Sequence, residues 1–241
     1  MGTHPIVQPQ KHDSNVTGGI VKRGLELVVT MVLQAAILFI SAGRLDWVNA
    51  WVYIVIYLGA IGINSLVLLP RNPELIAERA QPKENTKGWD KTISGLVGVA
   101  FLGSLLVAGL DVRFAWSPQA ALAVLVAGTI LLVLGNALFS WAMISNAFFS
   151  TLVRIQEDRS HTVATNGPYR FVRHPGYVGW VLMSFGIPVM LGSLWAVIPG
   201  ALSAFLMVVR TALEDKTLQS ELPGYKDYAA QVRYRLLPGI W

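Results

Sequence analysis

Long apolar runs, separated by short charged segments, constrain the fold of this chain more than any other feature. Four of them cover residues 24–43, 47–69, 92–110 and 119–144. Each is close to the ~20 residues that a helix needs to cross a bilayer. Only 14% of the residues are charged, against about 25% in a soluble domain, and most of this charge lies between the runs. The sequence therefore predicts an all-α, polytopic membrane helix bundle.

A further apolar region, residues 177–209, is too long for one span and too short for two full spans. As a single helix it would be roughly 50 Å long, whereas the hydrocarbon core is about 30 Å thick. Gly192-Ser193 and Pro199-Gly200 interrupt it. We expect a membrane hairpin that turns near Gly192, with two short or tilted arms. The predicted fold is thus four spans plus a C-terminal helical hairpin.

The polar segments complete the expected domain organisation. Residues 1–23 are predicted to be a disordered cytoplasmic tail, since they contain no apolar signal-peptide region. Residues 24–144 hold the four transmembrane helices, with a cytoplasmic linker at 70–92 that contains one short amphipathic helix around residues 73–80. Residues 145–241 form the functional region, which consists of the hairpin, a cytoplasmic cap and a cytoplasmic C-terminal segment.

Two polar clusters flank the hairpin. The first extends from Asn166 to Trp180 and the second is the segment 210–215. Because polar side chains are costly at a membrane boundary, such density predicts a functional site. We expect the two clusters to close on one another over a bound cofactor.

The count of Lys and Arg predicts the orientation. Along the chain the tail, the loops and the C-terminal segment hold three, one, five, one, four and five of them. This alternation indicates that both termini and both polar clusters are cytoplasmic, provided that the region 177–209 is a hairpin.

The residue types in the clusters suggest a chemistry. Arg173 is a fixed cation, His174 can donate or accept a proton near neutral pH, and Glu214 and Asp215 can accept hydrogen bonds from hydroxyl or ammonium groups. Pro175 is expected in the first turn of a helix whose free N–H groups face the site. Together they suit a zwitterionic ligand that carries hydroxyls, beside an apolar substrate from the lipid.

Each of these residues also has a structural explanation. An isolated Arg at this depth is about equally often a lipid anchor. Glu214 could be only the i,i+4 ion-pair partner of Arg210, and a lone His174 is more often structural. Tyr177 and Trp180 are typical of an aromatic interface belt. The combination with Gly and Pro is what favours a site.

Several classes of partner and chemistry are disfavoured. The chain has no Cys, which excludes disulfides, thiolate catalysis and Cys-ligated metals, and no metal site is predicted. The net charge is +5, but the basic residues form no contiguous stripe, so membrane lipids are the expected partner and nucleic acid is not.

The run from Gly167 to Arg170 and the run from Arg173 to Trp180 (Arg-His-Pro-Gly-Tyr-Val-Gly-Trp) resemble the signature of the isoprenylcysteine carboxyl methyltransferases and related phospholipid methyltransferases. Glu214-Asp215 stands where that family has an acidic pair, often two Glu. The segments 222–228 and 235–241 also resemble the family, with a weaker likeness at residues 72–75.

The resemblance implies an enzyme that uses S-adenosylmethionine as methyl donor, held between the two clusters. The cofactor site that it implies consists of Gly167, Tyr169, His174, Pro175, Tyr177, Gly179, Glu214 and Asp215. Arg173, Arg210 and Glu214 are the candidate catalytic residues. A carboxylate acceptor would need only desolvation and a cation such as Arg173 or Arg210. An amine acceptor would need Glu214 or His174 as a base.

The expected function is methyl transfer to a lipophilic acceptor that enters from the bilayer, with a prenylcysteine-type carboxylate as the first candidate. Three alternatives remain open: a phospholipid amine N-methyltransferase, an NADPH-dependent membrane reductase of the sterol-reductase type, and a non-catalytic membrane scaffold.

Overall fold

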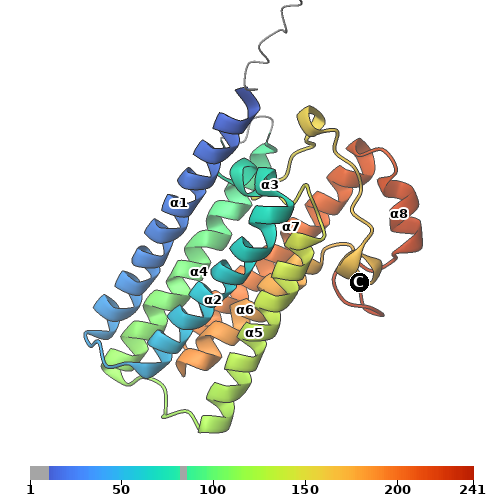
Figure 1. Ribbon diagram of the computed structural model, residues 1–241. Helices are drawn as coiled ribbons and strands as arrows, with labels where there is room; N and C mark the ends of the chain where they lie inside the picture. The colour runs from blue at the N-terminus through green and yellow to red at the C-terminus, as the bar shows by residue number, and fades with distance from the viewer. Residues whose placement is uncertain (1–10, 82–85) are drawn as a thin grey trace, which may run out of the picture.

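The computed structural model describes residues 11–81 and 86–241, with the side chains described from Val16 onward. Every regular element among these residues is a helix (Figure 1). In chain order the helices are α1 (Lys11–Ala42), α2 (Val48–Arg71), α3 (Pro73–Arg79), α4 (Gly88–Phe114), α5 (Leu122–Ile144), the 3-10 turns η1 (Glu157–Arg159) and η2 (Gly167–Arg170), α6 (Pro175–Leu191), α7 (Val197–Glu221) and α8 (Tyr225–Gln231).

Five of the described helices, α1, α2, α4, α5 and α7, are long and apolar enough to cross a membrane. Helix α6 is apolar but has only 17 residues, about 25 Å at 1.5 Å per residue. Gly192 ends it in the left-handed conformation, with φ 80°, and α7 begins at Val197. The prediction of a polytopic helical bundle is confirmed, and the C-terminal apolar region does form a hairpin that turns at Gly192.

Three of the predicted boundaries are wrong. Helix α1 begins at Lys11, so residues 11–23 are not a disordered tail; the tail residues 1–10 lie outside the described part. Helix α1 extends beyond its apolar run into these polar residues, because the part of a helix that lies outside the membrane can be polar. Pro70 lies inside α2 instead of ending it, and residues 88–92 of the predicted linker already belong to α4.

The predicted short helix of the linker is α3. Asn72 caps it, since its side-chain Oδ1 accepts a hydrogen bond from the Leu75 N–H at 3.1 Å, and Pro73 occupies the first turn. Helix α3 packs against α1 and α2 at the end of the bundle where the cap (residues 145–174 and 222–241) lies (Figure 1).

Helices α5 and α6 form the closest packed pair of the bundle, and glycines allow their approach. A Cβ placed on Gly179 would lie 2.6 Å from the carbonyl oxygen of Gly135, and one placed on Gly186 would lie 2.6 Å from the backbone nitrogen of Leu132. Small residues are common in membrane helix interfaces, because they let two backbones come close. This seam holds α6 in place, and with it the first polar cluster at its N-terminal end.

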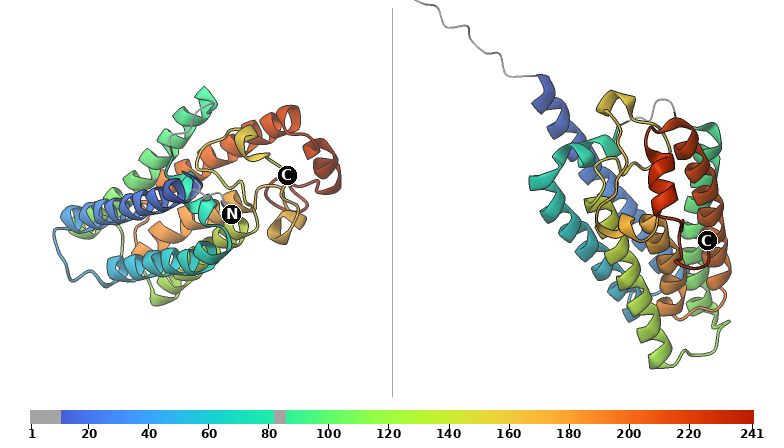
Figure 2. Two further views of the ribbon diagram at one scale, coloured as in Figure 1. Left: turned by 45° about the horizontal axis from the view of Figure 1, so that its top comes forward. Right: turned by 90° about the vertical axis from the view of Figure 1, so that its right-hand side faces the viewer.

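The turns at the opposite end of the bundle are fastened by one buried carboxylate. Asp111, near the end of α4, accepts hydrogen bonds from the N–H and hydroxyl of Ser117, at 2.7 and 2.6 Å, and from the hydroxyl of Ser193. The α4–α5 loop and the hairpin turn therefore meet there. The ends of α2, α5 and α7, the starts of α4 and α6, and the cap gather at the other end (Figures 1 and 2).

Candidate functional site

A pocket opens where the cap meets the bundle, with a cavity of about 100 Å³. Its walls come from the segment between α5 and η2, from the first turn of α6, from the C-terminal half of α7 and from α8. The lining residues are Asn146, Phe148, Phe149, Ser150, Leu152, Val153, Arg154, His161, Thr162, Val163, Ala164, Tyr169, Arg173, His174, Gly176, Tyr177, Arg210, Glu214, Leu218, Leu222, Tyr225 and Tyr228. Most of this surface is aromatic or aliphatic, with a few charged groups on the α6–α7 side.

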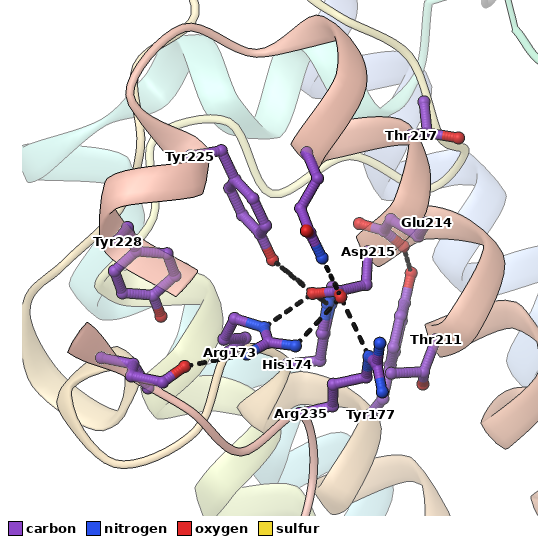
Figure 3. Close-up of polar contacts among 12 residues, drawn as sticks. Arg173, His174, Tyr177, Thr211, Glu214, Asp215, Thr217, Tyr225, Tyr228 and Arg235 are labelled. Atoms are coloured by element: carbon purple, nitrogen blue, oxygen red, sulfur yellow. Dashed lines mark hydrogen bonds and ion pairs between the residues drawn. The ribbon is translucent and has the colours of Figure 1, made fainter. Parts of the chain in front are cut away.

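The two polar clusters do meet, and Asp215 is the point of contact (Figure 3). Its carboxylate is completely buried. Arg173 donates to both carboxylate oxygens, from Nε at 2.7 Å and from the second guanidinium nitrogen at 3.0 Å. His174 Nε2 lies 3.2 Å from one of the oxygens. Asp215 therefore joins α7 to the start of α6.

The same carboxylate also holds the C-terminal part of the chain. It accepts hydrogen bonds from the Tyr225 hydroxyl at 3.0 Å, from Gln219 at 2.7 Å and from Arg235 Nε at 2.9 Å. Burial, together with the negative charge of Asp215, raises the pKa of Tyr225, so that its phenol stays protonated and donates. With these partners Asp215 does not line the pocket, and it is a structural centre of the cap.

Arg173 is likewise engaged in the fold. Besides Asp215, it donates to the backbone carbonyls of Val232 and Arg233, at 2.9 and 2.8 Å. The backbone N–H groups of Arg173 and His174 donate to the carbonyls of Tyr234 and Arg235, both at 2.9 Å. The segment before α6 and the segment after α8 are thus paired, which closes the cap over the pocket.

Glu214 differs from its neighbour Asp215, because it faces the pocket. Its Oε2 accepts a hydrogen bond from the hydroxyl of Tyr177 (Figure 3), and its Oε1 accepts none from the described residues. The Tyr177 ring stacks on His174, with ring centroids 5.6 Å apart and planes within 2°. Glu214 therefore offers one carboxylate oxygen to a ligand.

Arg210 lies over the Tyr177 ring, with the guanidinium carbon 5.2 Å from the ring centroid. Its partner in the described structure is Asp90 of α4, at 2.7 Å from Nε, rather than Glu214. The second guanidinium nitrogen also donates to the Thr151 carbonyl at 3.0 Å. The remaining nitrogen, Nη1, makes no hydrogen bond with any described residue. The i,i+4 explanation of Glu214 is therefore wrong, and Arg210 keeps a donor for the pocket.

The opposite wall is a strap, residues 146–164, which α3 supports. Arg79 donates to the Phe149 carbonyl at 2.8 Å, and Arg154 pairs with Glu78 at 3.0 Å. His161 Nδ1 lies 3.3 Å from the backbone N–H of Gln156. Burial, helped by the charges of nearby arginines, lowers the pKa of His161 to about 4, so that at pH 7 its imidazole is neutral.

The structure divides the predicted site residues into two groups. Tyr169, Arg173, His174, Tyr177, Arg210 and Glu214 line the pocket, whereas Gly167, Pro175, Gly179 and Asp215 do not. Pro175 holds the expected first-turn position of α6, and Gly179 is committed to the contact with α5. Gly167 adopts φ +59°, which favours glycine, and a Cβ there would lie 3.0 Å from the Trp141 indole nitrogen.

Sequence reasoning missed the aromatic half of the pocket and the buried partner of Arg210. Phe148 and Phe149 could have been noticed, since two adjacent aromatic residues in a polar segment indicate a buried surface. Tyr225 and Tyr228 lie in a segment whose family likeness was noted without a role. Asp90 carried no signal, because nothing in the sequence relates it to a residue 120 positions away.

The fold and the pocket define a class: a polytopic helical membrane protein whose C-terminal hairpin and cap enclose a pocket at one end of the bundle. Within that class, residues 128–220 match the model of the isoprenylcysteine carboxyl methyltransferase (ICMT) family. This part of the chain contains α6, nearly all of α7 and most of the pocket, and it is similar to that family.

Individual curated relatives show a similar likeness. Protein-S-isoprenylcysteine O-methyltransferase of Dictyostelium discoideum is 33% identical over 121 residues, which are 47% of this chain and 48% of that protein. The human protein of the same name is 39% identical over 67 residues, 27% of this chain and 24% of its own length. Protein-S-isoprenylcysteine O-methyltransferase A of Arabidopsis thaliana is 34% identical over 83 residues, 34% of this chain and 40% of that protein.

The chain thus spans between about a quarter and a half of the length of these curated relatives. The matches lend no support to the reductase or scaffold alternatives.

Proposed function

We propose that the chain is an integral membrane methyltransferase that uses S-adenosylmethionine to methylate a carboxylate on a lipophilic, prenylcysteine-type acceptor. One observation carries the proposal. In a mainly apolar pocket, Arg210 Nη1 and Glu214 Oε1 have no partner among the described residues, and both side chains contact Tyr177. A cation and a carboxylate are therefore available to ligands in the same small space.

The residues present suit S-adenosylmethionine. Glu214 Oε1 can accept a hydrogen bond from an ammonium or a ribose hydroxyl. Phe148, Phe149 and the aliphatic residues of the strap offer an apolar surface to an adenine ring. When bound, S-adenosylmethionine supplies an electrophilic methyl group. The remaining requirements, which are positioning and the exclusion of water, fall to the protein.

The two candidate catalytic cations have different roles in this proposal. Arg173 is occupied by Asp215 and by two backbone carbonyls, so it organises the cap. Arg210 keeps a donor, so it is the group that binds and orients the acceptor carboxylate. A carboxylate is already ionised at neutral pH, and its methylation needs no base. His174 is bonded within the cap and is assigned a structural role.

The orientation and the acceptor route belong to the same proposal. The distribution of Lys and Arg supports a cytoplasmic cap and cytoplasmic termini. The pocket reaches residues of α6 and α7, two helices of the apolar bundle, which supports an acceptor whose lipid tail stays in the bilayer.

The test combines binding and turnover on the purified protein. Calorimetry with S-adenosylhomocysteine should show binding by the wild type and by Arg210→Met, and weaker binding by Glu214→Gln. With labelled S-adenosylmethionine and an N-acylated S-farnesylcysteine, Arg210→Met should lose roughly 10²-fold in kcat/KM, the usual cost of one charge-stabilising donor. Arg170→Met, at an exposed position outside the pocket, is the matched control.

Three results would oppose the proposal. The absence of S-adenosylhomocysteine binding by the wild type would reject the cofactor assignment. An unchanged kcat/KM in Arg210→Met would reject the role of Arg210. With a lipid extract as the acceptor in place of the farnesylcysteine, a methylated product that resists base would be an amine rather than an ester, and it would assign Glu214 as the base of an N-methyltransferase.

A further inference from the structure

Asp90 is a buried acidic residue that lies outside both polar clusters and outside the family match. It stands in the first turn of α4 and is 0% exposed. A carboxylate without contact to water must be neutralised by a partner within the protein. The partners of Asp90 are Arg210 of α7, the backbone of the strap and, on its own helix, the Ser94 hydroxyl, which donates at 3.5 Å. This residue of the N-terminal half therefore contacts two elements of the pocket wall without lining the pocket itself.

Toward α7, Asp90 fixes the plane of the Arg210 guanidinium. Arg210 Nε donates to Oδ1 at 2.7 Å and Nη2 donates to Oδ2 at 3.2 Å, a paired arrangement that sets the direction of the group. The Thr151 carbonyl holds Nη2 from another side at 3.0 Å. Since Nε and Nη2 are held, the third nitrogen, Nη1, has a fixed position beside Tyr177.

Toward the strap, the same carboxylate fixes the pocket wall. The Val153 N–H donates to Asp90 Oδ2 at 2.7 Å, and the Val153 carbonyl accepts from the Lys87 N–H at 3.3 Å. Val153 lines the pocket. One buried carboxylate therefore holds both the cation and the backbone of the wall next to it.

We propose that Asp90 is a positioning residue, which orients Arg210 and the segment 151–153 toward the acceptor without touching either ligand. The inference rests on the proposed function, because it assigns the acceptor carboxylate to Arg210. It distinguishes two ligands in the pocket. Loss of Asp90 should impair use of the acceptor, while the affinity for the cofactor, which depends on Glu214 and the aromatic wall, should change little.

The experiment is a double-mutant cycle on the full-length protein in detergent or vesicles. The variants are Asp90→Asn, Arg210→Met and the double variant, and all rates are divided by the fraction that binds S-adenosylhomocysteine. Asp90→Asn alone should lower kcat/KM for an N-acylated S-farnesylcysteine about tenfold and change the S-adenosylhomocysteine Kd less than twofold. In the Arg210→Met background it should have no further effect, because the guanidinium is absent and the asparagine oxygen can still accept the hydrogen bond from the Val153 N–H.

The control is Asp111→Asn. Asp111 is a buried carboxylate on the same helix, but its partners are Ser117 and Ser193 at the far end of the bundle. Its loss should lower the folded yield or the thermal midpoint and leave the kinetics of the binding-competent fraction unchanged. The double variant of Asp90 and Arg210 removes both buried charges together, so it tests the inference even where Asp90→Asn alone does not fold.

The inference is overturned if Asp90→Asn lowers cofactor affinity and acceptor kcat/KM in parallel, or if it costs the same factor with and without Arg210. A double variant that differs more than threefold from Arg210→Met would also overturn it. A wild type without any methyl transfer would instead reject the proposed function, so the two failures are told apart.

Discussion

Glu214 and Asp215 are adjacent carboxylates for which the structure predicts opposite effects of the same substitution. Asp215 is fully buried and is contacted by five side chains, namely those of Arg173, His174, Gln219, Tyr225 and Arg235. Glu214 is bonded by the Tyr177 hydroxyl and keeps one open oxygen. Asp215→Asn should therefore act on the fold, whereas Glu214→Gln should act on binding.

The magnitude follows from the buried ion pair. Asparagine would present an NH₂ group to several of the donors that now point at Asp215, and it would leave the charge of Arg173, whose side chain is 6% exposed, without a counter-charge. Breaking such a pair costs about 3–5 kcal/mol. For a chain of this size that corresponds to a decrease of roughly 6–20 °C in the unfolding midpoint.

The assay is thermal unfolding in one detergent, together with limited proteolysis of the segment after Glu221. Asp215→Asn should lower the midpoint by this amount and expose the segment to protease. Glu214→Gln should keep the wild-type midpoint and weaken S-adenosylhomocysteine binding. Asp227→Asn, an exposed carboxylate on α8, is the control and should change neither. If Asp215→Asn unfolds like Asp227→Asn, the reasoning that makes Asp215 the centre of the cap is refuted.

Three other predictions concern packing, pH and orientation. Gly179→Ala should lower the unfolding midpoint, at a cost of about 1–3 kcal/mol, because its Cβ would meet the Gly135 carbonyl. Gly98→Ala, with no atom within 4 Å of its Cβ, is the control, and equal midpoints of the two variants would contradict close packing between α5 and α6. His161 has a pKa of about 4 in the folded chain and near 6.5 when unfolded, so the unfolded chain binds the proton first. Stability should fall as pH drops from about 6.5 to 4, and His161→Asn should flatten that decline in chemical denaturation; an equally steep decline would argue against the shift. In this Cys-free chain, a Cys introduced at Lys226 should react with an impermeant maleimide only from the cytoplasmic side and one at Asp46 only from the other, and the reverse pattern would contradict the orientation.

Much of the architecture could be predicted from the sequence, since it depends on local composition. The apolar runs predicted the helices of the bundle, and the length of residues 177–209 together with Gly192 predicted the hairpin. These conclusions follow from the cost of exposing backbone groups to lipid, which acts on each segment by itself. The helix boundaries were less predictable, because a helix such as α1 continues beyond the membrane as long as its backbone hydrogen bonds can form.

The site was predicted in outline, and its roles were not. The Arg-His-Pro-Gly-Tyr motif and the acidic pair predicted where the pocket lies, and six of the ten named site residues line it. Asp215 and Gly179, which were predicted to bind the cofactor, do not line the pocket. Asp215 faces the cap and Gly179 faces α5, and the direction in which a helical residue points depends on how neighbouring helices pack.

Local composition was enough to predict a membrane helix bundle with a polar hairpin region that resembles a known family. Which charged groups neutralise one another became apparent only from the packing of the helices in three dimensions. Arg173 forms an ion pair with Asp215. Arg210 forms one with Asp90, which lies 120 positions earlier in the chain. A buried charge needs an opposite charge close to it in the folded protein. Which distant segments come close together depends on helix packing and not on any local sequence pattern.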